Sequence, residues 1–148
     1  MNSIEKCFDT VGKILENLPN SWVDLTTHRL DIYNEAQAKS QFLSQLKALQ
    51  SAADFNAKTL EALPTAYDYI RLGHPLSSVL EWILAEINQV PADQVITFTA
   101  KTMPILAVIR KNALSNQQTR VYYNTDSSPL IDSQRLAQIY GYNVQLHP

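Results

Sequence analysis

Residues that could hold an anion gather in the turn Thr99–Thr102, which reads Thr-Ala-Lys-Thr. The turn follows a predicted strand and opens a predicted helix. Free helix N–H groups, hydroxyls and the Lys101 ammonium could therefore hold a phosphate or carboxylate. In open parallel sheets, ligands bind at the carboxyl ends of the strands, where this turn is expected. The plainer interpretation is that Thr102 only caps the helix and Lys101 is solvated, and the lack of phosphate-loop glycines favours it.

Other candidate residues give weaker signals. The polar turn Asn124–Ser128 could bind a ligand, but its residue types are those of a plain capping loop, which we favour. The three histidines, His28, His74 and His147, lack metal-ligand spacing. His74 stands directly before a proline, which favours a helix start over a binding site. There is no Gly-x-Ser-x-Gly elbow and no readable nucleophile–base constellation, so the sequence leaves open whether the chain is an enzyme.

The composition is that of an ordinary globular domain. The chain has 148 residues, of which 45% are hydrophobic and 18% charged, with a net charge of -2. Scattered basic residues and a slightly acidic balance give no support to a nucleic-acid or membrane partner. The N-terminus does not resemble a signal peptide, and no apolar run approaches the ~20 residues that span a bilayer. We therefore expect a cytoplasmic protein without bound metal.

The first segment, residues 1–64, is predicted to be helical. Apolar residues recur at steps of three and four over residues 4–18, which is typical of one helix face. A second helix is expected over residues 28–53, and Asp54 is expected to cap a short third helix. The single cysteine, Cys7, cannot form an internal disulfide, and its apolar neighbours favour a buried helix residue over a reactive thiol.

The second segment, residues 65–148, is predicted to alternate strands and helices. Pro75 suits the first turn of a helix, on which Glu81 is expected to be a solvated carboxylate. The strands are predicted over residues 95–98, 120–123 and 143–147, with helices around 105–109 and over 130–140, the latter capped by Ser128 before Pro129. Strands alternating with short helices predict parallel pairing. The fold class is therefore α/β: a helical half and then a βαβαβ parallel-sheet unit, within one domain, 1–148.

The last predicted strand lies at the edge of a small sheet. An unpaired edge presents free N–H and C=O groups to another chain. We therefore expect a homo-oligomer or a protein partner.

The stretch Tyr67–Asn112 also carries a family resemblance. It contains Tyr69-Ile70-Arg71, then Gly73-His74-Pro75, Leu80-Glu81 and Phe98-Thr99-Ala100-Lys101-Thr102-Met103. This order resembles the N-terminal part of the cystathionine γ-synthase and methionine γ-lyase family, which are fold-type-I enzymes that use pyridoxal phosphate.

The resemblance implies a pyridoxal phosphate site. Its cofactor-binding residues would be Tyr69, Arg71, Thr99, Lys101 and Thr102, because an arginine fork suits a phosphate dianion and hydroxyls add donors. The plainer alternative keeps Tyr69 as a packed aromatic and Arg71 as a surface cation. Lys101 replaces the glycine of the family's phosphate loop, and the family's Schiff-base lysine lies beyond the matched part.

Two classes of function follow. The first is a truncated or diverged relative of these enzymes that is not catalytic alone and that binds a phosphate-bearing ligand or pairs with another subunit. The second is a non-enzymatic protein–protein interaction module with no small-molecule ligand.

Overall fold

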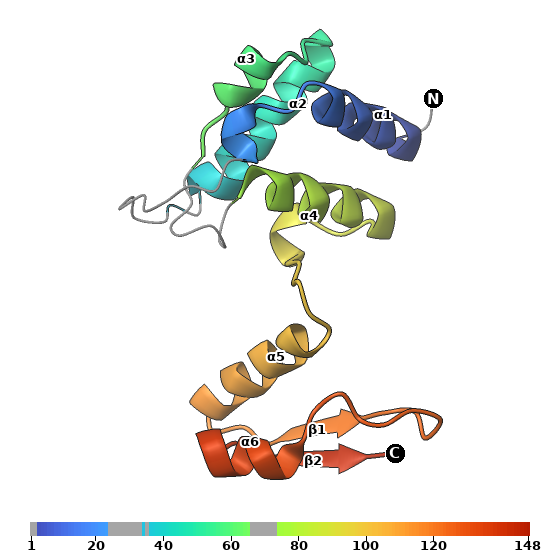
Figure 1. The fold of residues 1–148 in the computed structure, drawn as a ribbon, viewed down its shortest axis with the longest axis vertical. Helices are drawn as coiled ribbons and strands as arrows, with labels where there is room; N and C mark the ends of the chain where they lie inside the picture. The colour runs from blue at the N-terminus through green and yellow to red at the C-terminus, as the bar shows by residue number, and fades with distance from the viewer. Residues whose placement is uncertain (1–2, 24–33, 35, 66–73) are drawn as a thin grey trace. The chain divides into compact units, whose positions relative to one another are not determined.

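The computed structural model describes residues 3–23, 34, 36–65 and 74–148. The protein is mixed α/β and mostly helical, with a small two-stranded parallel sheet; the predicted βαβαβ order is not confirmed. The chain divides into two compact units, Met1–Thr97 and Phe98–Pro148 (Figure 1). The first unit is helical, and the second holds the sheet.

The N-terminal unit is built from helices packed around α4. Its described elements are α1 (Ser3–Glu16), the 3-10 turn η1 (Asn20–Trp22), the π-helix η2 (Ala36–Gln41), α2 (Phe42–Ala52), α3 (Ala57–Glu61), α4 (Pro75–Asn88) and the 3-10 turn η3 (Ala92–Gln94). Helix α4 contacts both α1 and α2. The helix that the sequence analysis assigns to the α/β segment therefore packs within the helical unit.

The core of this unit consists of apolar side chains from several helices. Its buried members are Cys7, Ile14, Trp22, Phe42, Leu46, Leu60, Leu63, Val79, Trp82 and Ile83. The rings of Trp22 and Phe42 lie 6.0 Å apart between centroids, in a tilted arrangement. Cys7 is the buried helix residue that the sequence predicts, and its burial raises the pKa of the thiol.

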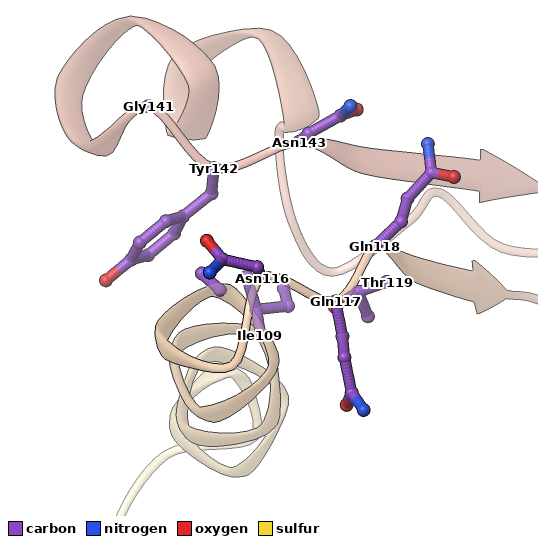
Figure 2. A pocket seen from close by; sticks show the side chains of 9 residues that line it. Ile109, Asn116, Gln117, Gln118, Thr119, Gly141, Tyr142 and Asn143 are labelled. Atoms are coloured by element: carbon purple, nitrogen blue, oxygen red, sulfur yellow. The ribbon is translucent and has the colours of Figure 1, made fainter.

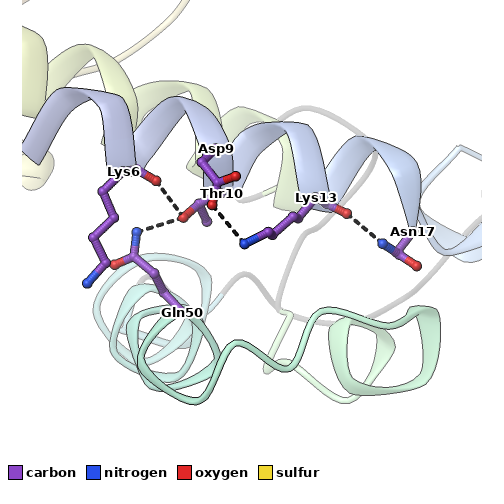
Figure 3. Close-up of polar contacts among 6 residues, drawn as sticks. All are labelled: Lys6, Asp9, Thr10, Lys13, Asn17 and Gln50. Atoms are coloured by element: carbon purple, nitrogen blue, oxygen red, sulfur yellow. Dashed lines mark hydrogen bonds and ion pairs between the residues drawn. The ribbon is translucent and has the colours of Figure 1, made fainter. Parts of the chain in front are cut away.

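Helix α1 buries a narrower face than its apolar pattern predicts. Cys7, Thr10 and Ile14 are buried, whereas Phe8 and Leu15 are exposed. The buried Thr10 hydroxyl donates to the Lys6 carbonyl at 2.8 Å and accepts from Gln50 Nε2 at 2.7 Å (Figure 3). A hydrogen-bonded threonine therefore joins α1 to α2 on the face that turns inward.

Two predicted helices of this unit differ from the expectation. The predicted start of the helix over 28–53 lies outside the described residues, but the helix is not continuous, because Asn34 is not helical and the π-helix η2 leads into α2. The short helix α3 is capped by Asn56, not Asp54. The Asn56 side chain accepts the Thr59 N–H at 3.0 Å, while the Thr59 hydroxyl accepts the Asn56 N–H. This reciprocal capping box satisfies two donors at once, so it sets the helix start at Asn56.

The C-terminal unit places two helices on one face of its sheet. Its described elements are α5 (Thr102–Leu114), β1 (Thr119–Tyr122), α6 (Ser133–Tyr140) and β2 (Val144–His147). The strands are parallel, with Thr119 opposite Val144 and Tyr122 opposite His147. The core of the unit consists of Ile109, Ile131, Leu136 and Val144, flanked by Ile105, Leu106, Val121, Tyr142 and Leu146. One face of the sheet therefore packs on α5 and α6.

The predicted strand over residues 95–98 is wrong. These residues form a connection without strand pairing, and the Thr97 N–H donates to the Glu81 Oε1 at 2.9 Å. The Thr97 hydroxyl donates to the same oxygen at 3.3 Å. A carboxylate of α4 therefore accepts the backbone hydrogen bond that a neighbouring strand would otherwise receive, and Glu81 is buried rather than solvated.

The last helix begins later than predicted. Helix α6 starts at Ser133 rather than at residue 130, because the Asp132 side chain accepts the Arg135 N–H at 3.0 Å. Ser128 and Pro129 lie in the preceding loop. The predicted end is correct: Gly141 follows the helix with φ 69°, a left-handed conformation that glycine adopts readily.

Candidate functional site

The predicted phosphate turn lies at the start of α5. Thr99 and Lys101 are exposed, and Lys101 is the N-cap residue without a side-chain capping bond. Because residues 95–98 are not a strand, the turn does not stand at the carboxyl end of a sheet. Tyr69 and Arg71 lie outside the described residues. The pyridoxal phosphate site therefore stays a prediction, and Thr99, Lys101 and Thr102 share only a helix start.

The second polar turn, Asn124–Ser128, forms hydrogen bonds among its own residues. The Asn124 side chain accepts the Asp126 N–H at 3.0 Å, and the Asn124 carbonyl accepts both the N–H and the hydroxyl of Ser127. These bonds are those of an Asx turn, which satisfies its own polar groups. The turn follows β1 without capping α6, so a local loop is the better description than a ligand site.

The uncovered face of the parallel sheet is the more distinctive surface. Arg120, Tyr122 and Gln145 point to this face and are exposed, and the half-buried His147 completes it. The rings of Tyr122 and His147 stack with centroids 5.2 Å apart, although Tyr122 is 70% exposed. Within the described part of the chain, the buried Nε2 of His147 has no hydrogen-bond partner. This face therefore combines a cation, an aromatic stack and an unpaired buried nitrogen.

The outer edge of β1 carries free backbone groups. Tyr123 donates its N–H to the His147 carbonyl at 2.9 Å, which fixes the side of β1 that faces β2. Backbone groups of successive strand residues point alternately to the two sides. Arg120 and Tyr122 therefore direct their N–H and C=O groups away from β2. The described residues contain only β1 and β2 in this sheet, so no described strand receives these groups.

A cavity at the amino-terminal ends of β1 and β2 was not predicted from the sequence. It has a volume of about 270 Å³ and lies where β1 and β2 begin, beside the last turn of α5 and the end of α6 (Figure 2). Its polar lining is uncharged, including Asn116, Gln118 and Asn143. The sequence places residue 116 and residue 143 far apart, and only the parallel pairing brings them to one end of the sheet.

His74 takes the helix-start role that the sequence favours. Its Nδ1 accepts the Leu76 N–H at 3.2 Å, directly before Pro75 at the first position of α4. Burial lowers the pKa of His74 from its usual 6.5, because a buried site disfavours the charged imidazolium. Protonation at Nδ1 would also remove the acceptor of this cap. His74 is therefore a neutral structural cap.

This cap predicts a pH-dependent stability. A histidine with a lower pKa in the folded state stabilises the fold fully above the unfolded value of 6.5, and this contribution is lost as the pH falls below it. We expect the free energy of unfolding to decrease between about pH 7 and pH 5. His74→Asn keeps a capping acceptor without titrating, so it should flatten this decrease in denaturant titrations. An unchanged pH dependence in His74→Asn would assign the effect to other groups.

Among residues 3–23, 34, 36–65 and 74–148, no cluster of three or more His, Cys, Asp or Glu side chains could hold a metal ion. None of the described helices has the length and apolarity that crossing a bilayer requires. Comparison with protein-family models, with curated proteins and with solved structures found no match.

Proposed function

We propose that the chain is a non-catalytic interaction protein that forms a symmetric dimer by pairing the β1 edges of two copies. The observation that carries the proposal is the open outer edge of β1 on a parallel sheet with one covered face. Parallel sheets are normally covered on both faces, and a two-stranded sheet has little stability of its own. Extension by a second copy would give four consecutive strands, β2-β1-β1-β2.

The chemistry of β1 favours pairing with itself. Only Arg120 and Tyr122 direct backbone groups outward, so two antiparallel copies satisfy both residues when Arg120 of one copy lies opposite Tyr122 of the other. In this register each pair exchanges N–H and C=O groups, and a guanidinium lies beside an aromatic ring. The two Arg120 side chains stay apart, so like charges are not opposed. A closed twofold dimer follows, because the same edge is used by both copies.

Exposed apolar surface on the C-terminal unit is consistent with such an assembly. Its exposed large apolar side chains are Phe98, Met103, Val108, Leu114, Tyr122, Leu130, Ile139 and Tyr140. Large apolar side chains that are exposed in one small unit are available for contact with a partner. Tyr122 belongs to both this set and the proposed edge.

A proline at the edge tests the pairing directly. Arg120→Pro removes an outward N–H without removing a bond to β2, and proline is tolerated on edge strands. Analytical ultracentrifugation of the full chain should show a wild-type dimer whose dissociation constant rises at least about tenfold in Arg120→Pro. Arg120→Ala is the matched control, since it keeps the N–H and should weaken pairing much less. A monomeric wild type, or equal pairing in Arg120→Pro, would contradict the proposal.

A side-chain exchange covers the case in which the proline disturbs the strand. Tyr122→Arg alone would place two cations opposite each other and should weaken the dimer. Adding Arg120→Glu to this variant restores opposite charges and should recover pairing. Failure of the double variant to recover, with the fold intact by circular dichroism, would rule out the proposed register.

A further inference from the structure

The uncovered face of the sheet gathers polar and aromatic side chains from both strands. They come from alternate positions of each strand and of the residue just before it: Gln118, Arg120 and Tyr122 on one side, and Asn143, Gln145 and His147 on the other. Figure 2 shows Gln118 and Asn143 directed to the same side, away from Asn116 and Tyr142. None of these six residues is acidic, so no carboxylate side chain accompanies Arg120 on this face.

The two rings of this face form a stack. The Tyr122 and His147 rings lie 5.2 Å apart between centroids, with an interplanar angle of 26°. His147 is half-buried and its Nε2 is buried, whereas Tyr122 is 70% exposed. One side of the Tyr122 ring therefore rests on His147, and the other side is open to solvent. A ring held in this way loses little side-chain freedom when a flat group packs on it.

The unit that carries this face is basic, although the whole chain is not. With histidine neutral, residues 98–148 hold five basic and two acidic residues, a net charge of +3, whereas residues 1–97 hold seven basic and twelve acidic residues, a net charge of -5. The whole-chain value of -2, which gave no support to a nucleic-acid partner, averages these two units. Asp126 lies in the turn after β1 and Asp132 caps α6, so neither carboxylate is on a strand. The C-terminal unit therefore attracts an anionic ligand.

We propose that this face binds a single-stranded nucleic acid. Unpaired bases stack on exposed aromatic rings, amides bond to base edges, and an arginine pairs with phosphate. The positions from Gln118 to Tyr122 span about 13 Å, which is room for about two bases. A duplex keeps its base faces covered, and an acidic peptide would leave the Tyr122 ring unused. The combination of ring, amides and cation therefore fits a single strand, and it does not rest on the proposed dimer.

A labelled single strand of about eight nucleotides, titrated with the full chain, tests the proposal by fluorescence anisotropy. We expect saturable binding. Unlabelled duplex and polyglutamate should compete at least about tenfold more weakly than the unlabelled single strand. RNA and DNA strands of the same sequence, titrated separately, show whether the 2′-hydroxyl contributes.

Substitutions of exposed tyrosines separate the ring of this face from a general effect. Tyr122→Ala should raise the dissociation constant at least about tenfold, whereas Tyr122→Phe keeps the ring and should bind like the wild type. Tyr140→Ala is the matched control, because Tyr140 is 60% exposed and stacked on Tyr142 but belongs to α6. Undiminished binding by Tyr122→Ala, or an equal loss in Tyr140→Ala, would overturn the proposal.

Gln145→Glu tests the phosphate contact without changing the β1 edge. A carboxylate opposite Arg120 would neutralise the guanidinium and repel phosphate, so the dissociation constant should rise at least about tenfold at low salt. Binding by Gln145→Glu that equals the wild type would contradict the phosphate contact and the proposal with it. Sedimentation of this variant should still show the wild-type oligomeric state, because the substitution is on β2.

The wild-type titration decides the matter even if a variant unfolds. Absence of saturable binding would overturn the proposal, and so would equal competition by the duplex or by polyglutamate, because charge alone would then account for binding. A monomeric wild type that binds the single strand would contradict only the β1-edge dimer, whereas a dimeric wild type that does not bind it would overturn only this inference.

Discussion

Phe42→Ala should lower the free energy of unfolding of the N-terminal unit by about 3–5 kcal/mol. Phe42 is 1% exposed and packs against Trp22, with Leu46 buried one turn further along α2. Removing the ring takes away its transfer free energy and leaves a cavity in a core that cannot fully collapse. The loss is a large part of the stability of a typical domain, so the unit should be partly unfolded at physiological temperature.

Tryptophan fluorescence during urea titration measures this effect selectively. Both tryptophans, Trp22 and Trp82, are buried in the N-terminal unit, so their emission reports that unit and not the sheet. Phe8→Ala is the matched control: it removes the same ring from α1, but Phe8 is 56% exposed and the change should stay within about 0.5 kcal/mol. Similar losses in the two variants would mean that Phe8 and Phe42 are equally buried, against the described core.

Local sequence signals predicted the helices well where one residue fixes the backbone. Pro75 has a fixed φ and no N–H, so it marked the first position of α4 correctly. Gly141 likewise marked the end of α6 because of its left-handed conformation. The predicted start of α6 was wrong, because Asp132 and Ser128 are both good capping residues and the prediction chose Ser128. Only the hydrogen bond from Arg135 N–H to Asp132 decides between them.

The failed strand over residues 95–98 shows where local signals end. Its β-branched and aromatic residues favour an extended backbone, and Val95 is indeed extended, while none of the four residues is helical. A strand also needs a neighbour, and that requirement is not encoded locally. Here the Thr97 N–H is received by Glu81, a residue that the sequence pattern assigned to solvent. The two errors have one cause, a tertiary contact between α4 and the segment that follows it.

The candidate sites depended even more on tertiary contacts. The sequence predicted an open edge on a small parallel sheet, but it assigned that edge to the last strand, residues 143–147, and not to β1. The amide-lined cavity was not predicted, because Asn116 and Asn143 have the residue type of ordinary turns. Their common position results from the register of β1 with β2, which no pattern in either segment specifies. A run of uncharged amides directly before a strand was the only local signal.

The second large effect is expected at Glu81. Glu81→Ala should lower the free energy of unfolding of the N-terminal unit by about 2–3 kcal/mol. The Thr97 N–H would lose its acceptor, and the Lys39 ammonium, 3.8 Å from Glu81 Oε2, would lose its counter-charge. Both charged side chains are largely buried, with 20% and 11% exposure for Lys39 and Glu81, so water compensates little. Glu81→Gln keeps an acceptor oxygen and should cost about 1 kcal/mol.

The exposed ion pair between Lys13 and Asp9 is the control that separates the effect of burial from the effect of distance. Lys13 and Asp9 on α1 approach to 2.8 Å, closer than Lys39 and Glu81, but their side chains are 42% and 46% exposed (Figure 3). Asp9→Ala should therefore change the free energy of unfolding by less than about 1 kcal/mol. Urea titrations followed by tryptophan fluorescence measure all three variants in the same unit. If Asp9→Ala cost as much as Glu81→Ala, distance rather than burial would set the energy, and Glu81 could not be what holds Thr97 against α4.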